Sequence, residues 1–156
     1  RRLEPRAAAP HRRLQTVRSL ARAGIPVGVN VAPVIPFLNE PEIERLIEAA
    51  AEAGATSVHY TVLRLPWEVN PLFQQWLDEH VPERAARIMA RVRDLRGGAD
   101  YRSQFGARMK GEGLWADLIA QRVAKACARA GVSRCGPPLD ATAFRPPGAE
   151  GQAELF

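Results

Sequence analysis

The segment 101–113 has the residue types best suited to binding nucleic acid. Three cations, Arg102, Arg108 and Lys110, alternate there with the aromatic residues Tyr101 and Phe105 and with glycines. Cationic groups hold phosphates, aromatic rings stack on bases, and glycine allows close approach of the backbone. The pattern predicts a nucleic-acid contact (DNA or RNA) at Arg102, Arg108 and Lys110. The alternative is a structural loop that packs its aromatic rings against the rest of the protein.

The charge distribution favours the same kind of partner. The chain of 156 residues has a formal net charge of +5, and residues 84–134 alone contain twelve basic and four acidic residues. A basic block attracts nucleic acid because its contacts release counterions from phosphates. The alternative is that these arginines only solvate helix faces. No run of about 18 apolar residues occurs, so we expect no membrane-spanning helix and a cytoplasmic protein.

The chain offers little for catalysis or metal binding. The spacing of Cys127 and Cys135 fits neither a zinc nor an iron–sulfur signature, which indicates two reduced thiols. His11, His59 and His80 have no acidic or cysteine partner nearby in the sequence, so each is interpreted as a surface or core residue. There is no Gly-x-Ser-x-Gly elbow, phosphate loop or HExxH motif. We therefore expect no catalytic residue and no metal ligand.

The last five residues resemble a known docking peptide. Gln152, Leu155 and Phe156 follow a segment rich in proline and glycine, and they match the Gln-x-x-Leu-Phe pattern by which bacterial proteins bind the DNA sliding clamp. An amide and two adjacent apolar anchors suit a short extended peptide in a groove. The sequence thus predicts a partner-binding site at the end of a disordered tail, residues 136–156.

The first half of the chain alternates between helix and strand. A helical pattern begins at Pro10, a strand follows over 25–35, a second helix begins near Asn39, and a second strand covers 57–64. Ala23-Gly24 and Ala53-Gly54 end the two helices thirty residues apart, the length of one βα unit. Buried strands joined by helices predict a parallel sheet. Two strands do not make a stable parallel sheet, so we expect further strands upstream.

The second half is predicted to be helical. Helices are expected near 70–77, 82–95 and 114–130, with a polar loop over 97–113. The predicted organisation is a βα region at 1–66, a basic helical extension at 67–135 and a flexible tail at 136–156. The missing initiator methionine indicates a fragment.

Several segments, in this order, resemble the second half of a radical S-adenosylmethionine barrel. The closest likeness is to the subgroup related to spore photoproduct lyase. It covers roughly residues 3–130 and rests on Leu3-Glu4-Pro5-Arg6, Ala23-Gly24-Ile25-Pro26-Val27, Val31-Ala32-Pro33-Val34-Ile35-Pro36, Leu63-Arg64-Leu65-Pro66 and Phe105-Gly106-x-Arg108-Met109.

This resemblance implies an α/β fold: the last two βα units of a partial parallel (β/α) barrel, then an α-helical C-terminal extension and a disordered tail. It implies a lyase-like activity, with reductive cleavage of S-adenosylmethionine and hydrogen abstraction from a substrate, and nucleic acid, as in DNA repair, is the candidate substrate. The family's CxxxCxxC motif for a 4Fe–4S cluster is absent from this chain, so the chain alone is expected to be inactive.

The resemblance also implies where the cofactor binds. In the family, S-adenosylmethionine lies across the carboxyl ends of the strands. The corresponding residues here are Glu4, Arg13, Val31, Pro33, Val34, Leu63 and Arg64. Arg64 is expected to face a substrate phosphate or the carboxylate of the cofactor. The alternatives are a surface ion pair for Arg13, a strand terminator for Pro33 and an N-cap for Asn39.

Two other functions remain open. One is a module that binds nucleic acid or the sliding clamp and performs no chemistry. The other is the end of a different barrel enzyme, such as an aldolase. A CxxxCxxC motif encoded upstream would distinguish the radical enzyme from both.

Overall fold

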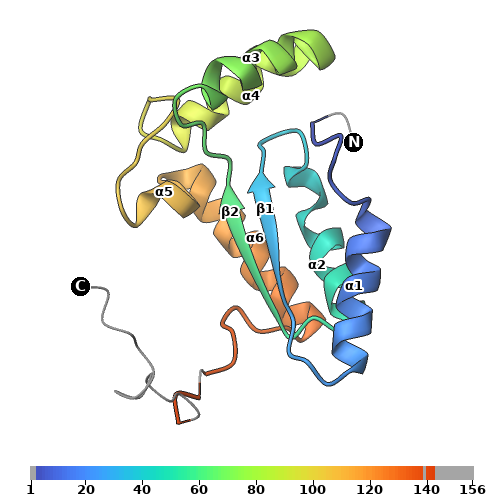
Figure 1. Ribbon diagram of the computed structural model, residues 1–156. Helices are drawn as coiled ribbons and strands as arrows, with labels where there is room; N and C mark the ends of the chain where they lie inside the picture. Colours follow the sequence, from blue (N-terminus) through green and yellow to red (C-terminus); the bar gives the residue numbers. More distant parts are fainter. Residues whose placement is uncertain (1–2, 139, 143–156) are drawn as a thin grey trace, which may run out of the picture.

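The computed structural model describes residues 3–138 and 140–142 (Figure 1). Two strands lie at the centre, with helices behind them and beyond their ends. The elements are α1 (Pro10–Arg22), β1 (Gly28–Val34), the 3-10 helix η1 (Glu40–Glu42), α2 (Ile43–Glu52), β2 (Ser57–Val62), α3 (Val69–His80), α4 (Pro82–Asp94), α5 (Ala107–Lys110) and α6 (Leu114–Ala130).

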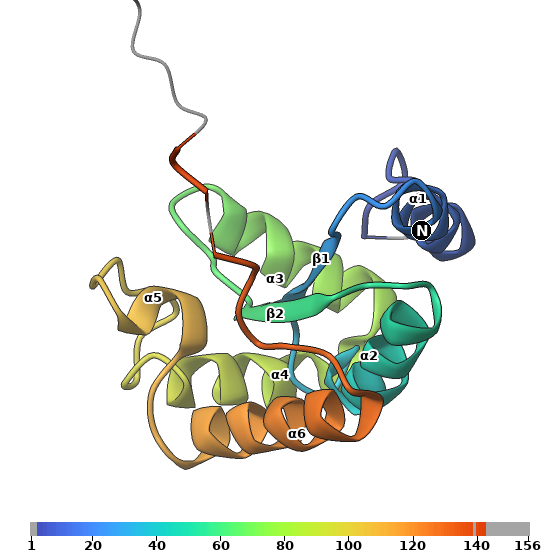
Figure 2. The same cartoon turned by 90° about the horizontal axis from the view of Figure 1, so that it is seen from below.

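The strands β1 and β2 form a parallel pair joined by α2, as the thirty-residue repeat predicts. Gly28 pairs with Ser57, and the register shifts between Val31 and Val34, where Pro33 has no N–H to donate. Figure 2 shows α2 and α6 on one face of this pair. That face contains the larger core, formed by Val31, Val34, Ile43, Ile47, Ala50, Ala55, Val58, Tyr60, Val62, Ile119, Val123, Ala126 and Cys127.

A second core lies beyond the carboxyl ends of the strands, under α3 and α4 (Figure 1). The residues that follow the strands contribute to this core: Ile35 after β1, and Leu63 and Leu65 after β2. Its other members come mainly from one face of each helix: Phe73, Leu77, Ala85, Ile88, Met89 and Val92. This core fixes the loops that follow both strands.

The prediction of a partial parallel barrel is wrong. The described residues form one sheet of two strands, and the outer edge of β2 is already occupied. Val58 N donates to Ser133 O at 2.9 Å, and Lys110 Nζ donates to Tyr60 O at 2.7 Å. Because these groups use hydrogen-bonding positions along that edge, no further strand among the described residues pairs with β2, and the sheet stops at two strands.

The helical second half agrees with the sequence pattern in part. The helices expected at 82–95 and 114–130 are α4 and α6, whereas the segment 97–113 is not only loop but contains α5. Asn39 occupies the N-cap position of η1, as expected, but its side chain makes no cap hydrogen bond there. Among the described residues no helix is both long and apolar enough to cross a membrane.

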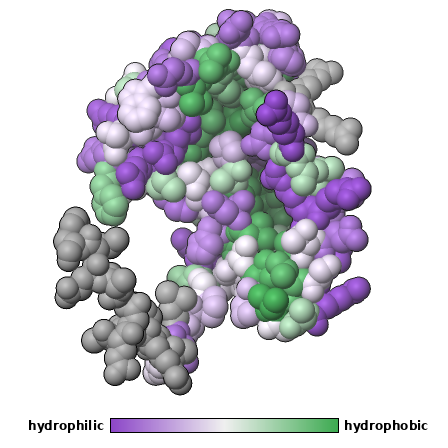
Figure 3. Space-filling view, viewed as in Figure 1, coloured by the Kyte–Doolittle hydropathy of each residue, from purple (hydrophilic) through white to green (hydrophobic). Residues whose placement is uncertain are grey.

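The other face of the sheet has no helix on it (Figure 2). Asn30 and Ala32 of β1 and His59 of β2 are exposed there, and Asn30 and His59 are register partners. Figure 3 views the molecule as Figure 1 does and shows apolar surface in the hollow between the strands and the N-terminal residues. This hollow is the first candidate site.

Candidate functional site

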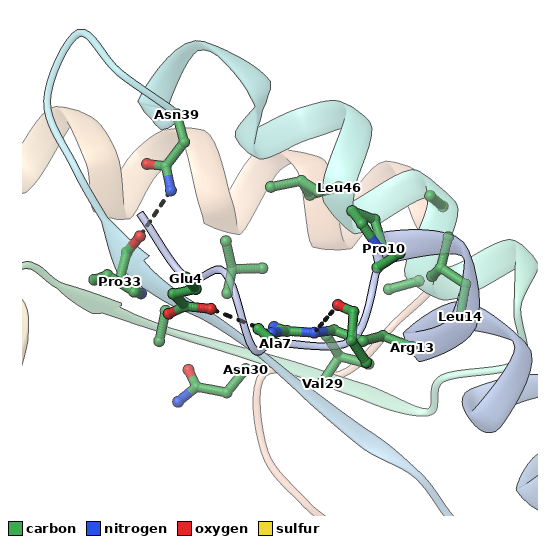
Figure 4. Close-up of a pocket in the computed structure, with 16 residues that line it drawn as sticks. Glu4, Ala7, Pro10, Arg13, Leu14, Val29, Asn30, Pro33, Asn39 and Leu46 are labelled. Atoms are coloured by element: carbon green, nitrogen blue, oxygen red, sulfur yellow. Dashed lines mark hydrogen bonds and ion pairs between the residues drawn. The ribbon is translucent and has the colours of Figure 1, made fainter. Parts of the chain in front are cut away.

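The cavity has a volume of about 310 Å³ and lies between α1, β1 and α2 (Figure 4). Its walls are mostly apolar, and its polar groups are Glu4, Arg13, Asn30 and Asn39. The apolar lining comes from Ala7, Ala8, Ala9, Pro10, Leu14, Val29, Val31, Ala32, Pro33, Leu46, Ala49 and Ala50. An apolar slot with a few polar groups at its rim is typical of small-molecule sites, and the size is at the lower end of their range.

An ion pair lies at one side of the cavity. The Arg13 guanidinium donates to the Glu4 carboxylate at 3.2 Å and to Ala8 O at 3.0 Å. Both side chains are more than half exposed, so the pair contributes at most about 1 kcal/mol to stability. The surface ion pair weighed for Arg13 therefore exists, and a ligand can recruit either partner at small cost.

Asn39 fixes the loop that forms the opposite wall. Its Oδ1 accepts from Ile35 N at 2.7 Å, and its Nδ2 donates to Pro33 O at 2.9 Å (Figure 4). The amide thus closes the loop after β1 rather than capping a helix. Because both bonds involve the backbone around Pro33, they hold the Pro33 ring in the cavity wall.

Arg122 of α6 anchors the same loop from behind. Its guanidinium binds the Glu44 carboxylate at 2.7 and 2.8 Å, donates to Glu40 O at 3.1 Å, and forms a short ion pair with the Glu40 carboxylate. Glu40 is buried, and burial lowers the pKa of Arg122. Sequence reasoning missed this cluster, although the spacing of Glu40 and Glu44 places them one helical turn apart.

The predicted cofactor residues divide into three groups. Glu4, Arg13, Val31 and Pro33 line the same cavity. Val34 and Leu63 are buried in the two hydrophobic cores. Arg64 lies against Tyr101 and Met109, outside this cavity.

The segment 101–110 presents aromatic and basic groups, but its cations differ in availability. Lys110 is held by Tyr60, with its Nζ 3.6 Å from the ring centroid, and burial lowers its pKa. Arg108 lies over the Phe105 ring at 5.3 Å, and Phe105 is 88% exposed. Arg102 faces Glu112 at 3.7 Å. Arg102 and Arg108 therefore remain available to phosphates, whereas Lys110 has a structural contact.

A second missed residue lies beneath this segment. Arg96 is 2% exposed, and its guanidinium donates to Leu63 O at 2.7 Å and to Ala107 O at 3.0 Å. It connects the end of β2 to the start of α5. Nothing in the local pattern at the end of α4 distinguishes this buried arginine from its exposed neighbours.

The thiols do not fit an iron–sulfur cluster. Cys127 is buried and Cys135 is exposed, and burial raises the pKa of the Cys127 thiol. Within the described part of the chain, no group of three or more His, Cys, Asp or Glu residues could hold a metal ion. Such clusters use three or four thiolates, so we derive no step from a cluster on this chain.

The histidines differ in their surroundings. His80 stacks on Trp76 and places its Nδ1 3.0 Å from Trp76 O, which indicates a structural role. His11 and His59 are exposed. The predicted clamp-binding residues Gln152, Leu155 and Phe156 lie outside the described residues.

The sequence of the chain aligns with part of several longer mycobacterial proteins. It is 29% identical over 159 residues to an uncharacterized protein of Mycobacterium bovis and, at the same identity, to uncharacterized proteins of two Mycobacterium tuberculosis strains. The alignment covers 99% of this chain and 42% of each relative, so the chain spans less than half of their length. No family model and no solved structure matches the chain.

Proposed function

We propose that this chain forms the S-adenosylmethionine-binding part of a longer radical S-adenosylmethionine protein of the subgroup related to spore photoproduct lyase. The observation that carries the proposal is the cavity beside β1. Four residues that the resemblance implies, Glu4, Arg13, Val31 and Pro33, line it together, although they are spread over thirty positions. The length of the relatives is compatible with a cluster-binding part elsewhere in the polypeptide.

The chemistry of the lining suits an adenosyl group. Val31, Pro33 and Ala49 offer flat apolar contacts for a purine ring, and the Glu4 carboxylate can accept hydrogen bonds from ribose hydroxyls. Arg13 can pair with a carboxylate once it leaves Glu4, which costs little because both groups are exposed. A 4Fe–4S cluster held elsewhere in the longer protein would reduce bound S-adenosylmethionine, which would then supply the adenosyl radical for hydrogen abstraction. The residues of this chain would bind and orient it, with the apolar wall against the purine.

Nucleic acid is the proposed substrate, and the cytoplasm the proposed location. Trp67 is 84% and Phe105 is 88% exposed, and Arg102 and Arg108 lie close to them in the folded chain. Large exposed aromatic rings next to guanidinium groups suit unstacked bases and phosphates. A nucleic-acid-binding module without chemistry remains the rival, and the test of the cavity separates the two.

The test is a calorimetric titration of the 156-residue chain with S-adenosylhomocysteine, which contains the same adenosine and carboxylate. We expect a dissociation constant in the range of about 10–100 μM. Ala49→Leu adds a branched side chain to the cavity wall and should weaken binding at least tenfold. Ala90→Leu, on the exposed face of α4, is the matched control and should leave binding unchanged. Absence of binding, or equal binding by the two variants, would refute the proposal.

A further inference from the structure

Three cations near the carboxyl end of β2 lack acidic partners. Arg64, Arg96 and Lys110 come from different segments and converge there through contacts with β2, the residues that follow it and α5. Among the described residues, none of the three forms an ion pair with a carboxylate. Of the three, only Arg96 is buried, and a buried positive charge is costly unless an opposite charge approaches it.

Two of these cations are close enough to repel each other. Burial and the nearby charge of Arg64 lower the pKa of Arg96, and Tyr101 and Glu112 offset part of this effect. The Nε atoms of Arg64 and Arg96 are both buried and have no hydrogen-bond partner. Buried hydrogen-bond donors normally have a partner, so these two Nε–H groups are free to donate to a ligand.

Arg64 lies between buried Arg96 and an open pocket. Its Nη2 donates to the Tyr101 hydroxyl at 3.2 Å, and Tyr101 lines the pocket together with Trp67, Arg102, Ser103 and Gln104. The pocket therefore presents a guanidinium, two hydroxyls and an amide from one short segment. Together these groups can donate several hydrogen bonds to one oxyanion such as phosphate.

We propose that Arg64, Tyr101 and Arg102 bind a phosphate group in this pocket, with Arg96 fixed behind them as a permanent positive charge. Glu112 is the only carboxylate paired with any of these groups among the described residues, 3.7 Å from Arg102, so it competes with an anion for that guanidinium. Trp67, whose ring is 84% exposed, offers a stacking surface for a flat group attached to the phosphate. The site shares no residue with the cavity beside β1, so it does not depend on the proposed cofactor.

The experiment measures phosphate binding to the 156-residue chain by ³¹P NMR line broadening, with chloride keeping the ionic strength constant. We expect inorganic phosphate to bind with a dissociation constant in the millimolar range. Arg64→Gln should weaken binding at least tenfold. Glu112→Gln should strengthen it several-fold, because the competing carboxylate becomes neutral. Arg45→Gln, an exposed arginine of α2 with the same change in net charge, should bind as the parent chain does.

Uridine 5′-monophosphate and uridine are titrated beside inorganic phosphate to identify the source of the phosphate. Tighter binding of the monophosphate than of either component indicates a phosphate ester stacked on Trp67, whereas equal binding of monophosphate and inorganic phosphate indicates a site for the free anion. No broadening of phosphate by the parent chain, or equal broadening by Arg64→Gln and Arg45→Gln, would overturn the proposal. Because Glu112→Gln removes no cation, it remains informative if Arg64→Gln fails to fold.

Discussion

Arg122→Met is expected to destabilise the protein far more than an ordinary surface arginine substitution. Arg122 neutralises Glu40 and Glu44 and anchors the loop after β1. Methionine preserves much of the apolar stem of arginine but none of its charge. The substitution therefore leaves the Glu40 carboxylate buried, with a 3.4 Å hydrogen bond from Phe37 N as its remaining partner.

The magnitude follows from the burial of the three side chains. Breaking a fully buried ion pair costs about 3–5 kcal/mol, because one charge remains without compensation. The side chain of Glu40 is 8% exposed, but those of Arg122 and Glu44 are each 32% exposed, so water recovers part of this cost. We expect a loss of about 2–4 kcal/mol in the free energy of unfolding. For a domain of this size this lowers the melting temperature by roughly 5–15 °C.

The assay is urea unfolding of the parent chain, Arg122→Met and the control Arg129→Met. Arg129 lies on the same helix and also pairs with a glutamate of α2, but at 3.5 Å and with side chains 63% and 50% exposed. The control should lose at most about 0.5 kcal/mol. Adding Glu40→Gln to Arg122→Met should restore at least about 1 kcal/mol, because the uncompensated carboxylate is gone.

Equal unfolding midpoints for Arg122→Met and Arg129→Met, or no recovery of stability on adding Glu40→Gln, would contradict the assignment of Arg122 as the anchor of this loop.

Three further predictions concern the rest of the chain. Binding of single-stranded nucleic acid, measured by fluorescence anisotropy, should weaken as the salt concentration rises. Replacing Arg102 and Arg108 by alanine should reduce the slope of log K against log salt by up to about 1.4. An unchanged slope would contradict phosphate contacts at these two arginines. Because Cys127 is buried and burial raises its pKa, a thiol reagent at pH 8 should modify Cys135 alone in the folded chain, and rapid labelling of both thiols, detected by mass spectrometry, would contradict this. The free energy of unfolding should also fall as pH rises through the thiol range, because the Cys127 thiol loses its proton at a lower pH in the unfolded chain than in the folded one. A peptide of residues 148–156 should bind the purified sliding clamp with micromolar affinity in calorimetry, and a version with alanine at its last two positions should not.

The parallel pair and the helices were predictable because their signals are local. Continuous β-branched runs, glycines after helices and the 3.6-residue spacing of apolar positions specify β1, β2, α4 and α6 within a few residues. The number of strands in the sheet, by contrast, is not determined by local sequence. Whether a third strand joins β2 depends on Ser133 and Lys110, which are fifty or more residues away in sequence and reach the edge only in the folded chain.

Part of the candidate site could also be predicted from the sequence. The residues that line the cavity beside β1 are close to strand ends and helix starts, so a family resemblance could place Glu4, Arg13 and Pro33 together. Arg64 lies at the carboxyl end of β2, as expected, and its side chain lies outside the cavity beside β1 because it contacts Tyr101, which is distant in sequence. Asn39 had two plausible hydrogen-bonding roles, and only the folded loop selects between them.

The two proposed sites lie toward opposite edges of the same two-stranded sheet, and this arrangement constrains how they could cooperate. The cavity adjoins β1, whereas the phosphate pocket lies beyond the end of β2. Between them is the sheet face that no helix covers, where Asn30 of the cavity wall is the register partner of exposed His59 (Figure 2). If both proposals hold, the small and polar residues of this uncovered face lie between the two bound groups, and another helix placed over the face would separate the two sites.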